Sequence, residues 1–199
     1  MKTLDEAWAW YRAVAERAKR LTHLAKFWDG FPWDQEHDWV EQVARDSVLR
    51  QVAANQMEKD AQLVTNELDD LAVLLLFSVF EANVRDLVEM QVRPEVDKLL
   101  HPALRSAGED VLQAITEGSF FRVLEPFKSQ VSHYLIETVN QVRRYRNWVA
   151  HGRRPLKEDE QLASVQPIEA YQRLKRFLEH LAPPPNVAEE AQAQEHPPT

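Results

Sequence analysis

Residues 60–92 carry apolar side chains at helical spacing, and around the middle of this segment they are apolar on nearly every side. A helix with apolar residues all round must be covered by other elements. The chain has only four glycines and is rich in Ala, Leu, Glu, Gln and Arg, which favour helices. We therefore predict an all-α protein, an antiparallel helical bundle built around this segment. The apolar positions that define its core are Leu68, Leu71, Leu74, Leu75, Val79 and Ala82.

Capping residues and helical spacing predict four to five main helices. The first runs over residues 3–27, with Thr3 as N-cap and Glu6 completing a capping box. Pro94 is expected to end the long apolar helix, and shorter helical turns are expected between it and Pro126. The other main helices are predicted over residues 36–57, 60–92, 127–151 and 167–181.

These helices are expected to form one domain over residues 1–182, with N-terminal helices in residues 1–59 and the core bundle in residues 60–182. Residues 183–199 are rich in Pro, Ala, Glu and Gln and are expected to be a disordered tail. The chain has no cysteine, which excludes disulfides, thiolate metal sites and cysteine nucleophiles. The beginning of the chain lacks the apolar core of a signal peptide, and no segment has the length of a membrane span, so we expect a cytoplasmic protein with no membrane contact.

A basic cluster stands out against the formal net charge of −8. Between Arg143 and Arg154 the chain places five arginines and one histidine, His151, within twelve residues. Histidine is suited to moving protons near neutral pH, and arginine to gripping phosphate with paired hydrogen bonds. The cluster predicts work on a phosphodiester, with RNA as the expected substrate. The acidic balance of the whole chain argues mildly against nucleic acid, although local charge matters more than the net value.

Helical geometry places Arg143, Asn147 and His151 on one stripe, whereas Arg146 lies about 140° away from His151. Asn147 is expected to orient His151 across one helical turn. One helix offers only one imidazole, so a complete acid–base site needs a second one. A symmetric homodimer that brings two such helix ends together would supply it.

The pattern Arg146-Asn147, three intervening residues and His151, late in a helical bundle of this size, resembles the signature of HEPN domains. The segment 77–82, with the acid Glu81 in the apolar helix, is also similar to prokaryotic HEPN proteins. The resemblance covers residues 60–182 best and lies nearest the stand-alone proteins of the RiboL-PSP type. The spacing alone is weak: chance gives roughly one to two cases of an arginine followed by a histidine after four to six intervening residues. The chain has four, among them Arg173 and His180.

The resemblance implies a homodimeric, metal-independent endoribonuclease without a cofactor, acting as a toxin or antiphage-defence effector. It implies that Arg146 and His151 are catalytic, that Asn147 supports them and that Glu81 is accessory. A partner protein such as an antitoxin or a defence-system component is also implied. The remaining cations of the cluster are the candidate RNA-binding residues, namely Arg143, Arg144, Arg153 and Arg154.

Structural alternatives exist for each of these residues. His151 could be a histidine favoured by the helix dipole, and the arginines could form a solvated basic face. Glu81 could instead form an ion pair with Arg85, four residues along the same helix. The acids Asp69 and Asp70 are predicted to be ordinary surface residues. At the level of function, the alternative is a non-catalytic helical module that binds RNA or a partner protein.

Overall fold

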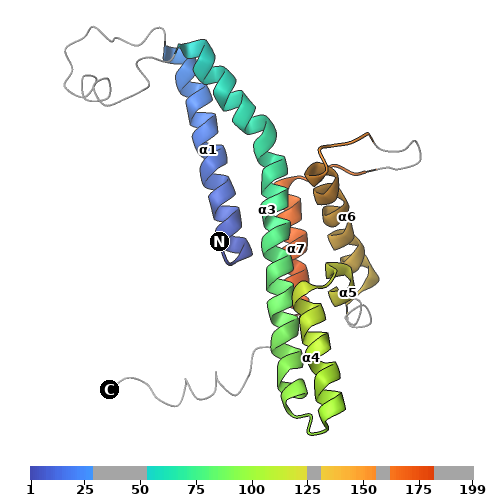
Figure 1. Ribbon diagram of the computed structural model, residues 1–199. Coiled ribbons are helices and arrows are strands. Elements are labelled where there is room, and N and C mark those ends of the chain that lie inside the picture. Colours follow the sequence, from blue (N-terminus) through green and yellow to red (C-terminus); the bar gives the residue numbers. More distant parts are fainter. Residues whose placement is uncertain (29–52, 125–130, 156–161, 182–199) are drawn as a thin grey trace, which may run out of the picture.

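The computed structural model describes residues 1–28, 53–124, 131–155 and 162–181. Within these ranges the chain is all-α, as predicted, with six helices and no strand (Figure 1). Their bounds are α1 Leu4–Trp28, α3 Ala54–Asp97, α4 Pro102–Glu117, α5 Phe120–Leu124, α6 His133–Ala150 and α7 Pro167–Leu181. The predicted tail and most of the helix predicted over residues 36–57 lie outside the described ranges.

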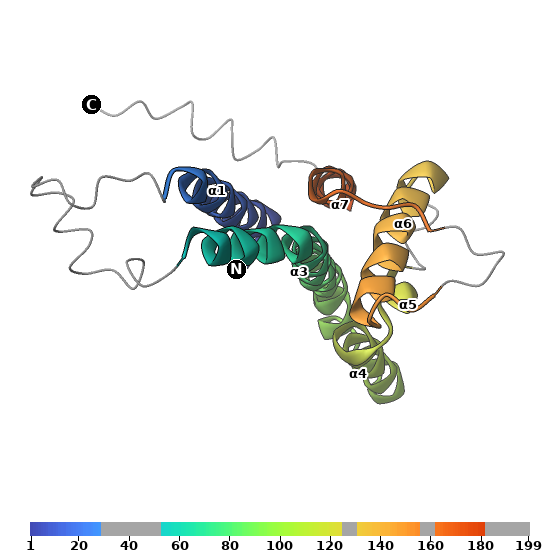
Figure 2. The same cartoon turned by 90° about the horizontal axis from the view of Figure 1, so that it is seen from above.

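The longest helix, α3, is the axis on which the others pack. It has 44 residues, which corresponds to a length of about 66 Å. Helices α1, α4 and α6 run antiparallel to α3, whereas α7 runs in the same direction as α3 (Figure 1). Seen from above, α1 and α7 lie next to each other along α3, with the ring of Trp8 stacked on that of Tyr171, and α6 lies beyond α7 (Figure 2).

Aromatic side chains fill the centre of the bundle where α3, α5 and α7 meet. The ring of Phe80 packs edge-on against Phe120, with centroids 5.7 Å apart, and against Phe177, with centroids 5.6 Å apart. Edge-to-face pairs of this kind add to the free energy gained by burying the rings. The inward face of α6 is formed by Leu135, Val139 and Val142, which are all buried.

The sequence predictions for α3 are wrong at both ends. The break expected before Asp60 does not occur, because α3 already begins at Ala54. Pro94 lies inside the helix, which continues to Asp97. Pro94 has no backbone N–H to donate, yet the last turn of α3 is maintained because Val96 in this turn is buried against Gly108 of α4. The contact is so close that a Cβ atom added at Gly108 would come within 2.7 Å of the valine side chain.

The ends of α6 follow from capping chemistry. The hydroxyl of Ser132 accepts a hydrogen bond from the backbone N–H of Leu135, so α6 begins later than residue 127. At the other end His151 is the C-cap residue and Gly152 has a positive φ of 77°, as predicted for the residue after a helix. The N–H of Gly152 donates to the carbonyl of Val149, and the N–H of Arg153 donates to the carbonyl of Trp148, each with an N···O distance of 3.0 Å. This pair of hydrogen bonds is a Schellman motif.

No helix in the described ranges has the combination of length and apolar character needed to cross a bilayer.

Candidate functional site

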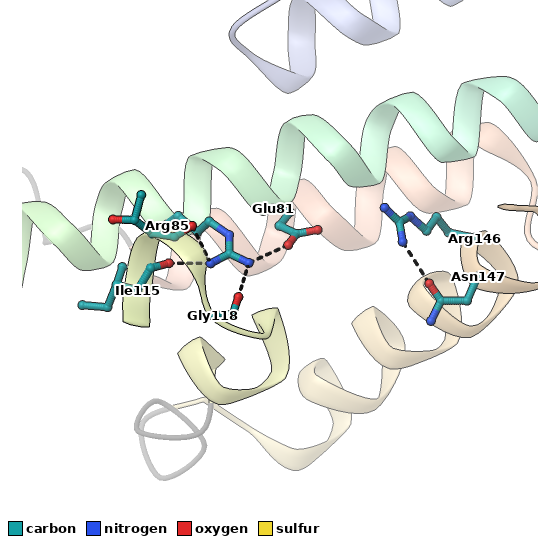
Figure 3. A network of polar contacts seen from close by, with 7 residues as sticks. Glu81, Arg85, Ile115, Gly118, Arg146 and Asn147 are labelled. Carbon is teal, nitrogen blue, oxygen red and sulfur yellow. Dashed lines mark hydrogen bonds and ion pairs between the residues drawn. The ribbon is translucent and has the colours of Figure 1, made fainter. Parts of the chain in front are cut away.

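The side chain of Arg146 points from α6 toward α3 (Figure 3). Its Cζ atom lies 5.6 Å from the centroid of the Phe77 ring, and its Nη1 donates a 3.0 Å hydrogen bond to Oδ1 of Asn147. Its Nε atom is buried and has no hydrogen-bond partner in the described part of the chain. An aromatic ring and an amide therefore hold a guanidinium with one buried donor that has no partner in the described part of the chain.

Glu81 lies on the same face of α3 as this guanidinium (Figure 3). Its Oε1 accepts a 2.8 Å hydrogen bond from Nη2 of Arg85, so the ion pair considered from the sequence is present. Arg85 also donates to the final carbonyls of α4, at Ile115 and Thr116, and to Gly118 over 2.8 Å. Glu81 thus holds in place an arginine that caps the end of α4.

His151 is exposed at the end of α6, where it is the C-cap residue. Its backbone N–H donates to the carbonyl of Asn147 over 3.0 Å. The amide side chain of Asn147 bonds to Arg146 rather than to His151. The adjacent arginine takes the amide oxygen of Asn147, and an orienting role for Asn147 toward the histidine stays a prediction. Asn147 positions the guanidinium.

Arg153 lies on the other side of the helix end and faces α3. Its Nε donates to Oδ2 of Asp70 over 2.8 Å, and its Nη2 donates to Oε2 of Glu67 over 2.7 Å. The hydroxyl of Tyr145 bonds to the second oxygen of Asp70 at 2.5 Å. Burial and this hydrogen bond raise the pKa of Tyr145 to about 12. The two carboxylates raise the pKa of Arg153 above its ordinary value.

The remaining cations of the cluster are not gathered around Arg146. Arg144 forms an ion pair with Glu137, seven residues earlier on the exposed face of α6. Arg143 is half-buried and is engaged by the chain itself. The side chain of Arg154 is exposed, and its carbonyl accepts a 2.8 Å hydrogen bond from the indole of Trp148. The structure joins Arg146 to Asn147, places Glu81 on the face of α3 toward which Arg146 points, and has His151 at the end of α6.

The sequence did not reveal the importance of Asp69 and Asp70. Their prediction as ordinary surface acids is wrong. Asp70 binds Tyr145 and Arg153, and Asp69 accepts a 2.8 Å hydrogen bond from Tyr11 of α1. Two adjacent acids inside an apolar helix were the available signal, because a carboxylate beside a core usually has a partner.

No group of three or more His, Asp and Glu side chains in the described ranges is arranged to hold a metal ion. A comparison of the chain with protein-family models, with curated proteins and with solved structures found no match.

Proposed function

We propose that this protein is a metal-independent endoribonuclease of the HEPN type. The observation that carries the proposal is the geometry of Arg146, a half-buried guanidinium fixed by Phe77 and Asn147, with one buried donor that has no partner in the described part of the chain. Donors that are fixed before the reaction stabilise charge that develops in a transition state, without the cost of reorganisation. A phosphate that gains negative charge on its non-bridging oxygens is the matching ligand.

The chemistry we propose is transesterification within RNA. The ribose 2′-oxygen attacks the adjacent phosphorus, a new O–P bond forms, and the bond from phosphorus to the 5′-oxygen breaks. One imidazole takes the proton of the 2′-hydroxyl, and another gives a proton to the leaving 5′-oxygen. His151 supplies one imidazole per chain, so two copies complete the site. The exposure of His151 at the end of α6 is compatible with such a shared site.

RNA as the substrate follows from this mechanism, because DNA has no 2′-hydroxyl. We propose cellular RNA in the cytoplasm as the target and a role as a toxin or antiphage-defence effector. A protein that cleaves cellular RNA needs restraint, so a partner such as an antitoxin belongs to the same proposal.

The alternative function is a non-catalytic helical module that binds RNA or a partner protein. The observation that favours it is that charged side chains of the candidate site are paired with other side chains of the same chain. Arg144 and Arg153 are both ion-paired within the chain, and Glu81 is engaged by Arg85. If the cluster serves only to hold the bundle together, the protein binds without cutting.

The experiment that separates the two functions is RNA cleavage in excess EDTA. Purified protein is incubated with single-stranded RNA and, separately, with DNA of the same sequence. The parent is expected to cut RNA alone, and His151→Ala and Arg146→Ala are expected to lose this activity. The matched control is His180→Ala, because Arg173 and His180 share the Arg–His spacing but Arg173 is bonded to Gln141 and Glu169. An inactive parent that still binds RNA favours the module.

A further inference from the structure

We infer that Arg153 is a positioning residue, which fixes the turn that carries His151 by binding Glu67 and Asp70 of α3. This inference rests on the proposed function for its meaning in catalysis. It reassigns a residue that the sequence placed among the RNA contacts.

The backbone around His151 needs such support. His151 leaves the helix with φ −91° and ψ 17°, and the next two residues have positive φ values, 77° at Gly152 and 54° at Arg153. Within the described ranges Arg153 is the only residue other than glycine with a positive φ. A side chain in the left-handed region strains the backbone, and surrounding contacts must maintain it.

The ion pairs of Arg153 supply those contacts. Its guanidinium reaches both carboxylates, with bonds of 2.8 Å to Asp70 and 2.7 Å to Glu67. Asp70 is the more buried partner, since its side chain is 15% exposed, and it is held in turn by the hydroxyl of Tyr145. One cation thus faces two anions, so the local charge repels a phosphate rather than attracting it.

The same helix, α3, also holds the other half of the site. Arg146 rests on Phe77, about two turns of α3 beyond Asp70. Arg146 and Arg153 both contact α3. This helix therefore fixes the Arg146 guanidinium and the His151 turn relative to each other. Loosening the Arg153 contacts releases the turn without disturbing Arg146. The imidazole of His151 is then expected to be misplaced, while Arg146 still binds the phosphate.

The test uses Arg153→Asn and Asp70→Asn, singly and together. Asparagine tolerates the left-handed backbone conformation, so Arg153→Asn removes the ion pairs while the backbone at position 153 can still adopt a positive φ. Arg93→Gln is the matched control, because it also removes an ion-paired arginine, but one on α3 that belongs to none of the candidate site residues. Three quantities are measured: the imidazole proton resonance of His151 by NMR, the kcat and KM of RNA cleavage, and the salt dependence of RNA binding. Comparison with His151→Ala assigns the resonance.

Each single variant is expected to shift the His151 resonance and to lower kcat roughly tenfold or more, because small misplacements of a catalytic group are costly. KM and the salt dependence are expected to stay at parent values, and the double variant to be no slower than either single variant. Arg93→Gln is expected to leave the resonance and kcat unchanged.

The inference is overturned if Arg153→Asn leaves the His151 resonance unmoved. It is also overturned if Arg153→Asn raises KM and reduces the salt slope by about one, which marks a lost phosphate contact. A parent that does not cleave RNA defeats the proposed function, yet the NMR comparison still decides whether Arg153 holds the turn.

Discussion

The guanidinium of Arg85 binds Glu81 on its own helix and, at the same time, the last carbonyls of α4 (Figure 3). This contact joins two helices through a side chain that is only 18% exposed. A charged hydrogen bond in such a setting contributes more to stability than a surface ion pair does.

We therefore predict that Arg85→Ala lowers the free energy of unfolding by about 2–4 kcal/mol, because carbonyls at the end of α4 and the Glu81 carboxylate lose a partner. Arg93→Ala is the matched control, since Arg93 also pairs with an acid four residues earlier, Glu89, but at the surface. Urea unfolding monitored by circular dichroism measures both. Equal losses in the two variants would contradict the structural role of Arg85.

Stability is predicted to fall at high pH through Tyr145. Its pKa is raised from 10.0 to about 12 by burial and by the bond to Asp70. The unfolded chain therefore releases this proton at a lower pH than the folded chain does. The stabilisation is fully present below pH 10 and is lost as pH rises toward 12. Unfolding measured at several pH values in this window should show a shallower decline for Tyr145→Phe than for the parent. An unchanged slope would show that the hydroxyl does not carry the effect.

Replacing either of two glycines by alanine is predicted to lower the stability, for a different reason at each position. At Gly152 a Cβ atom would meet nothing within 4 Å, yet the φ of 77° makes Gly152→Ala cost about 1 kcal/mol. At Gly108 the φ is not the obstacle, and the new methyl would press on Val96. Overpacking of this kind costs about 1–3 kcal/mol.

The second substitution Val96→Ala distinguishes the two causes. It should recover part of the stability lost in Gly108→Ala, because it removes the atoms that clash, and it should do nothing for Gly152→Ala. Thermal unfolding of the single and double variants gives the comparison. Additive losses in Gly108→Ala with Val96→Ala would contradict the close contact of α3 and α4.

Much of the fold could be predicted because local chemistry decides it. The bounds of α7, Pro167–Leu181, match the prediction, since a proline begins a helix whose apolar residues lie on one face. The hydroxyl of Thr3 caps α1 as expected. Pro94 misled the prediction because packing at Val96, not local preference, decides where α3 ends. The contacts of Arg153 could not be predicted, because its partners lie 83 and 86 residues away in the sequence.

Arg146, Asn147 and His151 could be proposed from the sequence as candidates, but their geometry could not. Helical arithmetic separated Arg146 from the stripe of Asn147 and His151. The arginine reaches Asn147 along the helix surface, so side-chain length overrides the angular separation. The docking of Arg146 on Phe77 depends on how α6 packs against α3, which a single sequence does not specify.

The shared site predicts that two helix ends meet, and the absence of cysteine allows a clean test. Ala150 is exposed beside His151, so Ala150→Cys is expected to form a disulfide-linked dimer on mild oxidation. Leu100→Cys is the control, because Leu100 is 95% exposed at the far end of the molecule, where α3 and α4 meet. Non-reducing electrophoresis at matched concentrations measures both. Cross-linking through position 100 alone would contradict the proposed dimer.

The most direct measurement of the central claim uses a DNA oligonucleotide that contains a single ribonucleotide, incubated with the protein in excess EDTA. We predict one cut, on the 3′ side of that ribose, leaving a 2′,3′-cyclic phosphate, and no cut by His151→Ala. Cleavage at deoxyribose linkages, or equal cleavage by His151→Ala, would contradict a mechanism in which His151 acts on a ribose 2′-hydroxyl.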